Sequence, residues 1–238
     1  MQKNSHDSVS GCQTLPYWLS YIQRPNGREV RETIHTETPD SWAVNLTLLW
    51  PLVRRLPYSR ATSLLKDFNL VVSTSRGNER NTCSEMWYLL GEVGDRGSTV
   101  EPTPAIGLVV AKTKLESIKA VHDLRLLLKE RPWEFKYTLK LVPIQSVSEA
   151  SLDAIQSSAL SLAQKIGDNE TFRVTVEKRH TGLSRKTIID SIAKKVDRKV
   201  KLEKPDRIIM VDIIGDLAGV ALVKPDDILS VEREKRKG

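Results

Sequence analysis

The chain has 238 residues, of which 39% are hydrophobic and 28% are charged, and its formal net charge is +7. This length allows one large or two small domains, and no apolar run reaches the roughly 18–20 residues of a membrane span. We also expect no signal peptide, and two cysteines form neither a disulfide framework nor a metal cluster. These features predict a cytoplasmic protein without a membrane partner. The basic balance favours polyanionic partners, because neutralising phosphates releases condensed counterions.

Residues 1–63 differ in pattern from the rest of the chain. They hold three of the five tryptophans and five of the eleven prolines, but their apolar residues follow no helical or strand period. The local conformational preferences of these residues do not agree with the pattern of apolar residues, which is typical of a sequence under little folding constraint. We expect an irregular extension that is poorly ordered or results from a start codon assigned too far upstream. A genuine but irregular N-terminal arm is the alternative.

Residues 64–132 show the pattern of a small α/β unit. A β-branched strand over 68–74 precedes a helix with Cys83, Met86, Trp87 and Leu90 on its apolar face. A strand over 105–110 and a second helix follow, and Arg131-Pro132 ends that helix. The order strand, helix, strand, helix predicts a ferredoxin-like unit.

Residues 133–230 predict a second α/β unit. It opens with an alternating strand over 134–141, and Ser146 and Glu149 have capping-box spacing for the helix behind them. A strand over 172–177, a helix that begins after Ser184, and strands over 207–214 and 218–223 complete it. The mixed-charge residues 231–238 predict a frayed tail. The fold class is therefore α/β (α+β).

The second unit carries a family resemblance. Its run Phe-Arg-Val-Thr-Val-Glu-Lys-Arg-His over 172–180 resembles the strand and basic turn of the THUMP domain, an RNA-binding module of tRNA-modifying enzymes and their adaptors. Residues 183–189 resemble the start of its second helix, and 200–206 resemble its segment ending in Asn-Pro-Asp. Lys204 stands where the family tends to have Asn, and Lys201 where Asp is usual.

Two further runs narrow the resemblance within the family. The Arg-His-Thr-x-Leu-Ser-Arg run over 179–185 and the opening over 68–79 resemble the tRNA-binding adaptors for N4-acetylcytidine formation. The resemblance covers about residues 66–230 and implies two partners, tRNA and a separate acetyltransferase. The acetyltransferase would supply acetyl-CoA, ATP and the chemistry. The adaptor itself would then need no cofactor and no small-molecule substrate.

The residues themselves predict no catalytic centre. No Ser-His-Asp or Cys-His pairing can be argued, no nucleotide-binding fingerprint is present, and no sequence remains for a cofactor domain. We therefore expect that the protein is not an enzyme. The alternatives are an adaptor or subunit for tRNA methylation or thiolation, an enzyme with an unrecognised site, and a module that binds only protein.

Seven residues are candidate RNA contacts: Lys178, Arg179, His180, Arg185, Lys186, Arg76 and Arg80. The first five flank the turn into the 184–196 helix, where positive side chains and free backbone N–H groups would hold a phosphate. A solvated basic surface is the other interpretation of that turn. The loop with Arg76 and Arg80 has neither a P-loop nor a GxGxxG pattern, so a plain strand-to-helix turn is its alternative.

The helix over 184–196 continues with Lys194, Lys195, Arg198 and Lys199, which form either an RNA stripe or an ordinary charged outer face. His180 is the lone histidine of its region, so we do not interpret it as a metal ligand. Cys83 lies on the apolar face of its helix and is interpreted as a core residue.

Overall fold

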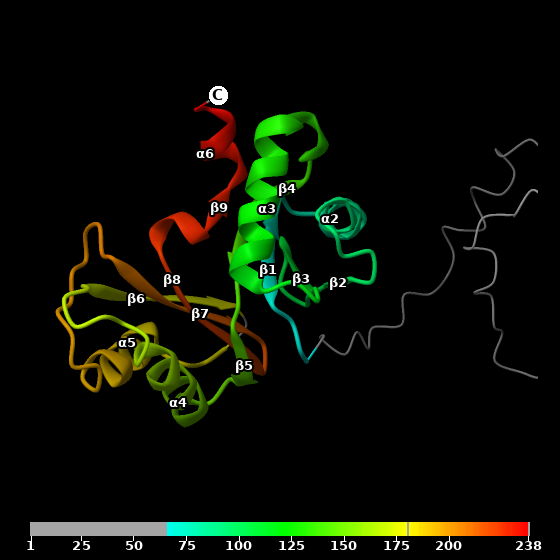
Figure 1. Cartoon of the computed structure of the whole chain (residues 1–238). Helices are drawn as coiled ribbons and strands as arrows, with labels where there is room; N and C mark the ends of the chain where they lie inside the picture. The colour runs from blue at the N-terminus through cyan, green and yellow to red at the C-terminus, as the bar shows by residue number, and fades with distance from the viewer. Residues whose placement is uncertain (1–65, 180, 238) are drawn as a thin grey trace, which may run out of the picture. The chain divides into compact units, whose positions relative to one another are not determined.

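A computed structural model describes residues 66–179 and 181–237 (Figure 1). Residues 1–65, with the predicted extension and Cys12, lie outside the described residues, and so does His180. Within the described part, no helix combines the length and apolar character needed to cross a membrane.

The first sheet has five strands in the order β2-β3-β1-β4-β9, and all its pairings are antiparallel. Its strands are β1 (Leu70–Thr74), β2 (Thr99–Pro102), β3 (Leu108–Lys112), β4 (Thr138–Pro143) and β9 (Leu229–Ser230). Helix α2 (Glu79–Glu92) connects β1 to β2. Helix α3 (Ser117–Glu130) and the 3-10 helix η3 (Pro132–Glu134) connect β3 to β4. This is the β-α-β-β-α-β connectivity of a ferredoxin-like unit, as predicted.

The strand predicted to open the second unit belongs to this first sheet. β4 pairs with β1 from Leu70 opposite Pro143 to Thr74 opposite Thr138, and it is the last strand of the ferredoxin-like connectivity. The end of the chain also returns to this sheet, where β9 pairs with β4. Residues 231–235, predicted as part of a frayed tail, form the short helix α6 (Val231–Lys235), whose Val231 is buried in the core.

The second sheet has the strand order β5-β8-β7-β6, in which only β6 and β7 are parallel. Its strands are β5 (Ser146–Glu149), β6 (Phe172–Arg179), β7 (Arg207–Ile214) and β8 (Leu217–Val223). Helix α4 (Leu152–Ala163) precedes β6, and helix α5 (Arg185–Ala193) connects β6 to β7. The short 3-10 helix η4 (Pro225–Asp227) follows β8.

The predicted capping box at Ser146 and Glu149 is wrong. These residues form the edge strand β5, in which Ser146 lies opposite Val220 of β8. Their backbone groups are therefore engaged in the sheet and not at a helix end. The helix cap is Ser151, whose hydroxyl accepts a hydrogen bond from the backbone N–H of Ala154 at 3.2 Å.

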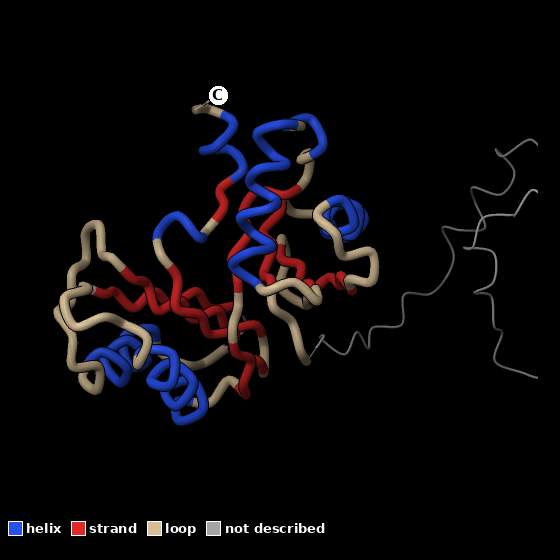
Figure 2. The backbone as a smooth tube through the Cα atoms, in the orientation of Figure 1, coloured by secondary structure: helices blue, strands red, loops and turns tan. Residues whose placement is uncertain are grey.

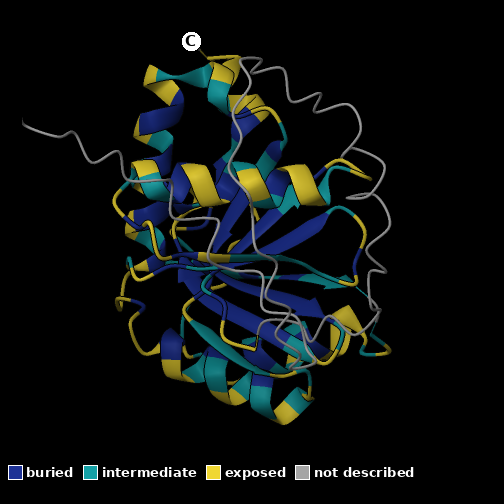
Figure 3. Ribbon diagram, turned by 90° about the vertical axis from the view of Figure 1, so that its right-hand side faces the viewer, coloured by how far each residue is buried: buried dark blue, intermediate teal, exposed yellow. Residues whose placement is uncertain are grey.

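Three buried clusters show how helices and sheets are layered. Alternate residues of the first sheet, such as Leu70 and Val72, pack against α2 and α3. The intervening Val71 packs in one cluster with Met210 of the second sheet. The opposite face of the second sheet, with Val211, packs against α4 and α5. The described unit is thus a helix, sheet, sheet, helix arrangement, with the buried strands between outer helices (Figures 2 and 3).

Helix α2 is rotated from the predicted orientation. Its buried residues are Thr82, Met86, Leu89 and Leu90. Trp87, which the periodicity placed on the buried face, is 56% exposed.

Candidate nucleic-acid interface

The predicted basic turn lies at the edge where the parallel strands β6 and β7 end. The carbonyl oxygen of Arg179, the last residue of β6, accepts a hydrogen bond from the N–H of Gly215 at 3.1 Å. Gly215 has a φ of +60°, a left-handed conformation that glycine adopts without strain, and it turns the chain from β7 into β8. The chain then leaves β6 and enters α5 after Ser184. The side chains around this turn therefore share one edge of the second sheet.

Two of the predicted RNA contacts at this turn have internal partners. The Lys178 ammonium donates to the carbonyl oxygen of Leu183 at 2.8 Å, which fixes the loop before α5. The Arg185 guanidinium forms an ion pair with Glu177 at 3.3 Å, although its side chain is 54% exposed. Both cations therefore hold the turn in shape.

The other two predicted RNA contacts at this turn, Arg179 and Lys186, have no such internal partners among the described residues. Arg179 is half-buried and Lys186 is exposed, and neither side chain forms a hydrogen bond or an ion pair within residues 66–179 and 181–237. Arg76 and Arg80 are also exposed, but they lie at the β1–α2 turn of the first unit. The seven candidates thus come from two different parts of the fold.

The β1–α2 turn has a structural carboxylate at its centre. Glu79 accepts a hydrogen bond from the N–H of Gly107 at 2.7 Å. This bond, with further backbone N–H groups, lowers the pKa of Glu79 despite its partial burial. The carboxylate thereby ties the start of α2 to the start of β3.

A hollow of about 710 Å³ opens beside the β6–α5 turn. Its walls include Thr181 and Gly182 from the loop before α5 and Ser151 from the cap of α4. Two carboxylates, Glu149 and Asp216, also line it, against the single ammonium of Lys66. A phosphate in this hollow would meet like charges, so its charge does not suit a phosphate site.

Positive charge concentrates along the chain from β6 through α5 to the start of β7. Residues 178–204 carry ten Lys or Arg and three Asp or Glu, a net charge of +7 that equals that of the whole chain. Its exposed lysines are Lys186, Lys194, Lys195, Lys199, Lys201 and Lys204. In the described structure only Lys195 of these six has a side-chain partner, Gln156 Oε1 at 2.7 Å. We call residues 178–204 the basic segment.

Asp212 is a buried carboxylate beside the same edge, and the sequence analysis missed it. It lies opposite Glu177 in the parallel register of β6 and β7, and it is 4% exposed. Burial raises the pKa of Asp212 to about 6. The charges of Lys140 and Arg179 oppose this shift, and that of Glu177 reinforces it. The only sequence signal is that Asp212 interrupts the apolar run of β7.

Comparisons with known proteins identify the second sheet and its helices. Residues 149–223 match the THUMP domain family, so the chain contains a THUMP domain. This range runs from the end of β5 to the end of β8 and includes α4, α5 and the whole basic segment. The domain indicates RNA binding in tRNA modification. Among the described residues, no group of three His, Cys, Asp or Glu side chains could hold a metal ion.

Three solved structures are similar to parts of this chain. TrmN from Thermus thermophilus is 19% identical, with a TM-score of 0.46 over 64% of this chain and 44% of that one. PH1313 from Pyrococcus horikoshii Ot3 is 18% identical, with a TM-score of 0.45 over 66% of this chain and 55% of that one. A 4-thiouridine synthetase–RNA complex with bound ATP is 12% identical, with a TM-score of 0.44 over 69% and 42%. The chain thus spans about half the length of these proteins, and no curated protein matches it.

Proposed function

We propose that the protein binds tRNA through its THUMP domain and presents it to a separate acetyltransferase for N4-acetylcytidine formation. The observation that carries RNA binding is the basic segment, whose exposed lysines mostly lack internal partners within the described residues. Lysines that neutralise phosphates release condensed counterions, which favours binding to a polyanion. The deep major groove of A-form RNA hides its base edges, so recognition by charge and shape suits this surface.

The choice of acetylation is the finer part of the proposal. It is supported by the resemblance of the runs over 179–185 and 68–79 to the adaptors for N4-acetylcytidine formation. The non-catalytic role is supported by the lack of a recognisable catalytic pairing or nucleotide-binding fingerprint in the sequence.

RNA binding is tested with the full chain and total tRNA over a series from about 50 to about 200 mM KCl. Lys186→Ala/Lys199→Ala removes two exposed charges of the basic segment, and Lys114→Ala/Lys129→Ala removes two exposed charges from the first unit as a matched control. Each lost phosphate contact should reduce the salt slope by about 1, so the first double variant should have a slope shallower by about 2. The control should keep the slope of the unmodified chain. Equal slopes in the two variants would show that net charge, and not this surface, governs binding.

The acetylation step is tested by analysing tRNA nucleosides from cells that lack the protein. Loss of N4-acetylcytidine alone is the expected result, and the purified chain with acetyl-CoA and ATP should form none. Loss of a methylated or thiolated nucleoside instead would assign the adaptor to another modification. Product formation by the purified chain would make the protein an enzyme.

A further inference from the structure

The segment between α5 and β7 presents apolar side chains to solvent. Residues 199–204 are all exposed, and the buried Pro205 follows them. Leu202 is 71% exposed and Val200 is 49% exposed, and they are the only large hydrophobic side chains that the described part of the second unit exposes. We call residues 199–204 the leucine loop. It forms the last part of the basic segment.

The first half of the leucine loop is fixed to the start of β6. The backbone N–H of the buried Phe172 donates to the carbonyl oxygen of Lys199 at 3.0 Å, and its carbonyl oxygen accepts from the N–H of Lys201 at 2.9 Å. The Arg173 guanidinium donates to the carbonyl oxygen of Leu202 at 2.9 Å. These bonds engage the backbone of the loop, so the Leu202 side chain is presented on an ordered frame.

The end of the leucine loop is held through Asp206. Its carboxylate accepts from the backbone N–H of Thr171 at 2.8 Å, and the Thr171 hydroxyl and N–H lower the pKa of Asp206. Between the two fixed ends, Lys204 has a φ of +46°, the only positive φ of a non-glycine residue in the described structure. A loop that is held in such a conformation before binding loses less entropy when a ligand arrives.

The charge around Leu202 suits a polyanion. Lys199, Lys201 and Lys204 are exposed in the same loop, and Glu203 is its only carboxylate. None of the three ammonium groups forms a hydrogen bond or an ion pair within the described part of the chain. An exposed apolar side chain among such lysines fits a phosphate backbone whose sugars and base edges are accessible.

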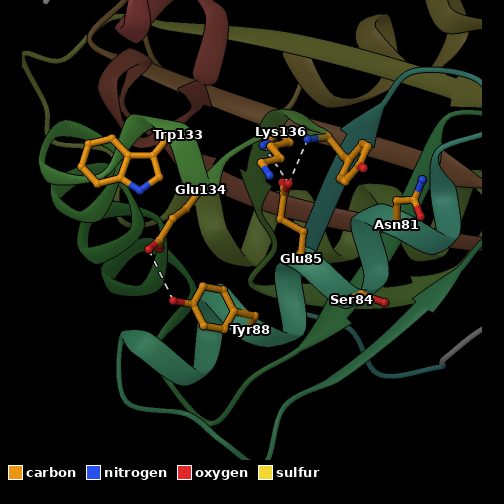
Figure 4. Close-up of a pocket in the computed structure, with 8 residues that line it drawn as sticks. Asn81, Ser84, Glu85, Tyr88, Trp133, Glu134 and Lys136 are labelled. Atoms are coloured by element: carbon orange, nitrogen blue, oxygen red, sulfur yellow. Dashed lines mark hydrogen bonds between the residues drawn. The ribbon is translucent and has the colours of Figure 1, made fainter. Parts of the chain in front are cut away.

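The exposed apolar side chains of the first unit have a different setting. A pocket of about 460 Å³ lies between α2 and the segment from η3 to β4, and Trp133 and Tyr88 line it (Figure 4). Its Glu134 carboxylate accepts from the Tyr88 hydroxyl at 3.4 Å, and its Glu85 carboxylate accepts from three backbone N–H groups. Lys136 is the only lysine in its wall. The leucine loop therefore matches a polyanion better than this pocket does.

A-form RNA offers a surface that matches the leucine loop. Its minor groove is wide and shallow and displays ribose hydroxyls and base edges between two phosphate strands. Proteins that bind a minor groove often place a leucine at a base step and cationic side chains beside it. The minor groove of B-form DNA is only about 6 Å wide, so an undistorted DNA duplex would accept the lysine contacts but not the leucine.

We propose that the leucine loop enters the minor groove of a helical stem of tRNA, with Leu202 against ribose and base edges and its lysines at the flanking phosphates. This inference deepens the proposed function and rests on it for RNA as the ligand. It assigns a non-ionic part of the RNA affinity to Leu202 and an ionic part to Lys199, Lys201 and Lys204.

The two parts are separated by tRNA binding of the full chain over a salt series. Leu202→Ala should weaken binding about fivefold, because apolar contact is lost, and should keep the salt slope, because no charge is removed. Lys201→Ala should instead reduce the slope by about 1. Leu126→Ala, at a leucine of α3 that is 59% exposed, is the matched control and should bind like the unmodified chain.

The groove is tested with a short RNA hairpin and the DNA hairpin of equivalent sequence. Leu202→Ala should weaken binding of the RNA hairpin about fivefold and leave binding of the DNA hairpin unchanged. Leu202→Met, which keeps an apolar side chain, should bind the RNA hairpin nearly as well as the unmodified chain. An equal loss with both hairpins, or a loss only with a single-stranded RNA, would overturn the proposal.

Failure of this proposal differs from failure of the proposed function. If the unmodified chain binds tRNA and Leu202→Ala binds it equally well, only the groove contact is refuted, and the leucine loop becomes a candidate contact for a protein. If the unmodified chain binds neither tRNA nor the RNA hairpin, RNA binding itself is refuted and this proposal with it.

Discussion

Replacing Asp212 by asparagine removes an ionisable group that the fold buries between its two sheets. The pKa of Asp212 is about 6, against an ordinary value of 3.8. One pKa unit corresponds to about 1.4 kcal/mol, so the ionised carboxylate destabilises the folded state by about 3 kcal/mol near neutral pH. The asparagine side chain would have a similar size and shape but no charge to bury.

The sign of the pH dependence follows from proton binding. Because the folded state holds the Asp212 proton more tightly, it binds more protons than the unfolded chain between pH 3.8 and about 6. The free energy of unfolding contributed by Asp212 therefore falls as pH rises through that window and is level above it. This contribution is absent from Asp212→Asn.

The assay is urea unfolding of the full chain and of Asp212→Asn at about pH 4 and about pH 7.5. The two proteins should have similar stability at the lower pH, and the variant should be more stable by up to about 3 kcal/mol at the higher pH. Asp216→Asn, at an exposed position of the same β7–β8 hairpin, is the matched control and should show no such gap. A variant less stable than the unmodified chain at about pH 7.5 would refute the reasoning, because Lys140 and Arg179 would then outweigh the cost of burial.

Three further predictions concern stability and reactivity. Asp95→Asn tests the opposite pH dependence. The Thr113 hydroxyl and the N–H groups of Lys114 and Gly97 lower the pKa of Asp95 in the folded state. The ionised carboxylate therefore stabilises the fold above pH 3.8, and this stabilisation is lost as pH falls through the folded pKa. The loss should be about 2 kcal/mol in urea unfolding near neutral pH, and equal stability there would contradict it. Gly107→Ala should destabilise by about 1–3 kcal/mol, because φ is +74° and a Cβ would lie 2.8 Å from the Thr74 carbonyl oxygen. Gly182→Ala, with no atom within 4 Å of its Cβ, should change stability by less than about 0.5 kcal/mol in the same thermal or urea assay. Burial raises the pKa of the Cys83 thiol to about 11. Iodoacetamide should therefore modify Cys83 slowly at neutral pH and rapidly only in denaturant. If Cys83 in the folded protein reacted at the rate of an exposed thiol, the prediction would be wrong.

The sequence predicts best those elements that have either one buried face or a continuous apolar run. The strand over 172–177 corresponds to β6, whose alternate residues are buried. The strands over 207–214 and 218–223 correspond to β7 and β8, which are apolar runs buried on both faces. Periodicity does not identify a strand's partner, however. The alternation before residue 141 indicated a half-buried strand correctly, but only the pairing of β4 with β1 shows which sheet it joins.

Short elements were missed for a related reason. β2, β5 and β9 have two to four residues each, and their backbone groups are satisfied by neighbours distant in sequence, as in the pairing of Lys140 with Ser230. Pairing with strands distant in the sequence makes these residues extended, although their local sequence does not predict a strand. For β5, the capping-box spacing of Ser146 and Glu149 was the competing local signal.

For the candidate site too, the sequence predicted which residues lie together but not which contacts they make. The sequence located Lys178, Arg179, Arg185 and Lys186 at one turn, where the structure also brings them together, and their role in RNA binding remains a prediction. It did not show that Lys178 and Arg185 are engaged by Leu183 and Glu177. Nor did it distinguish the exposed Trp133 from a core tryptophan, because exposure depends on how η3 lies against α2.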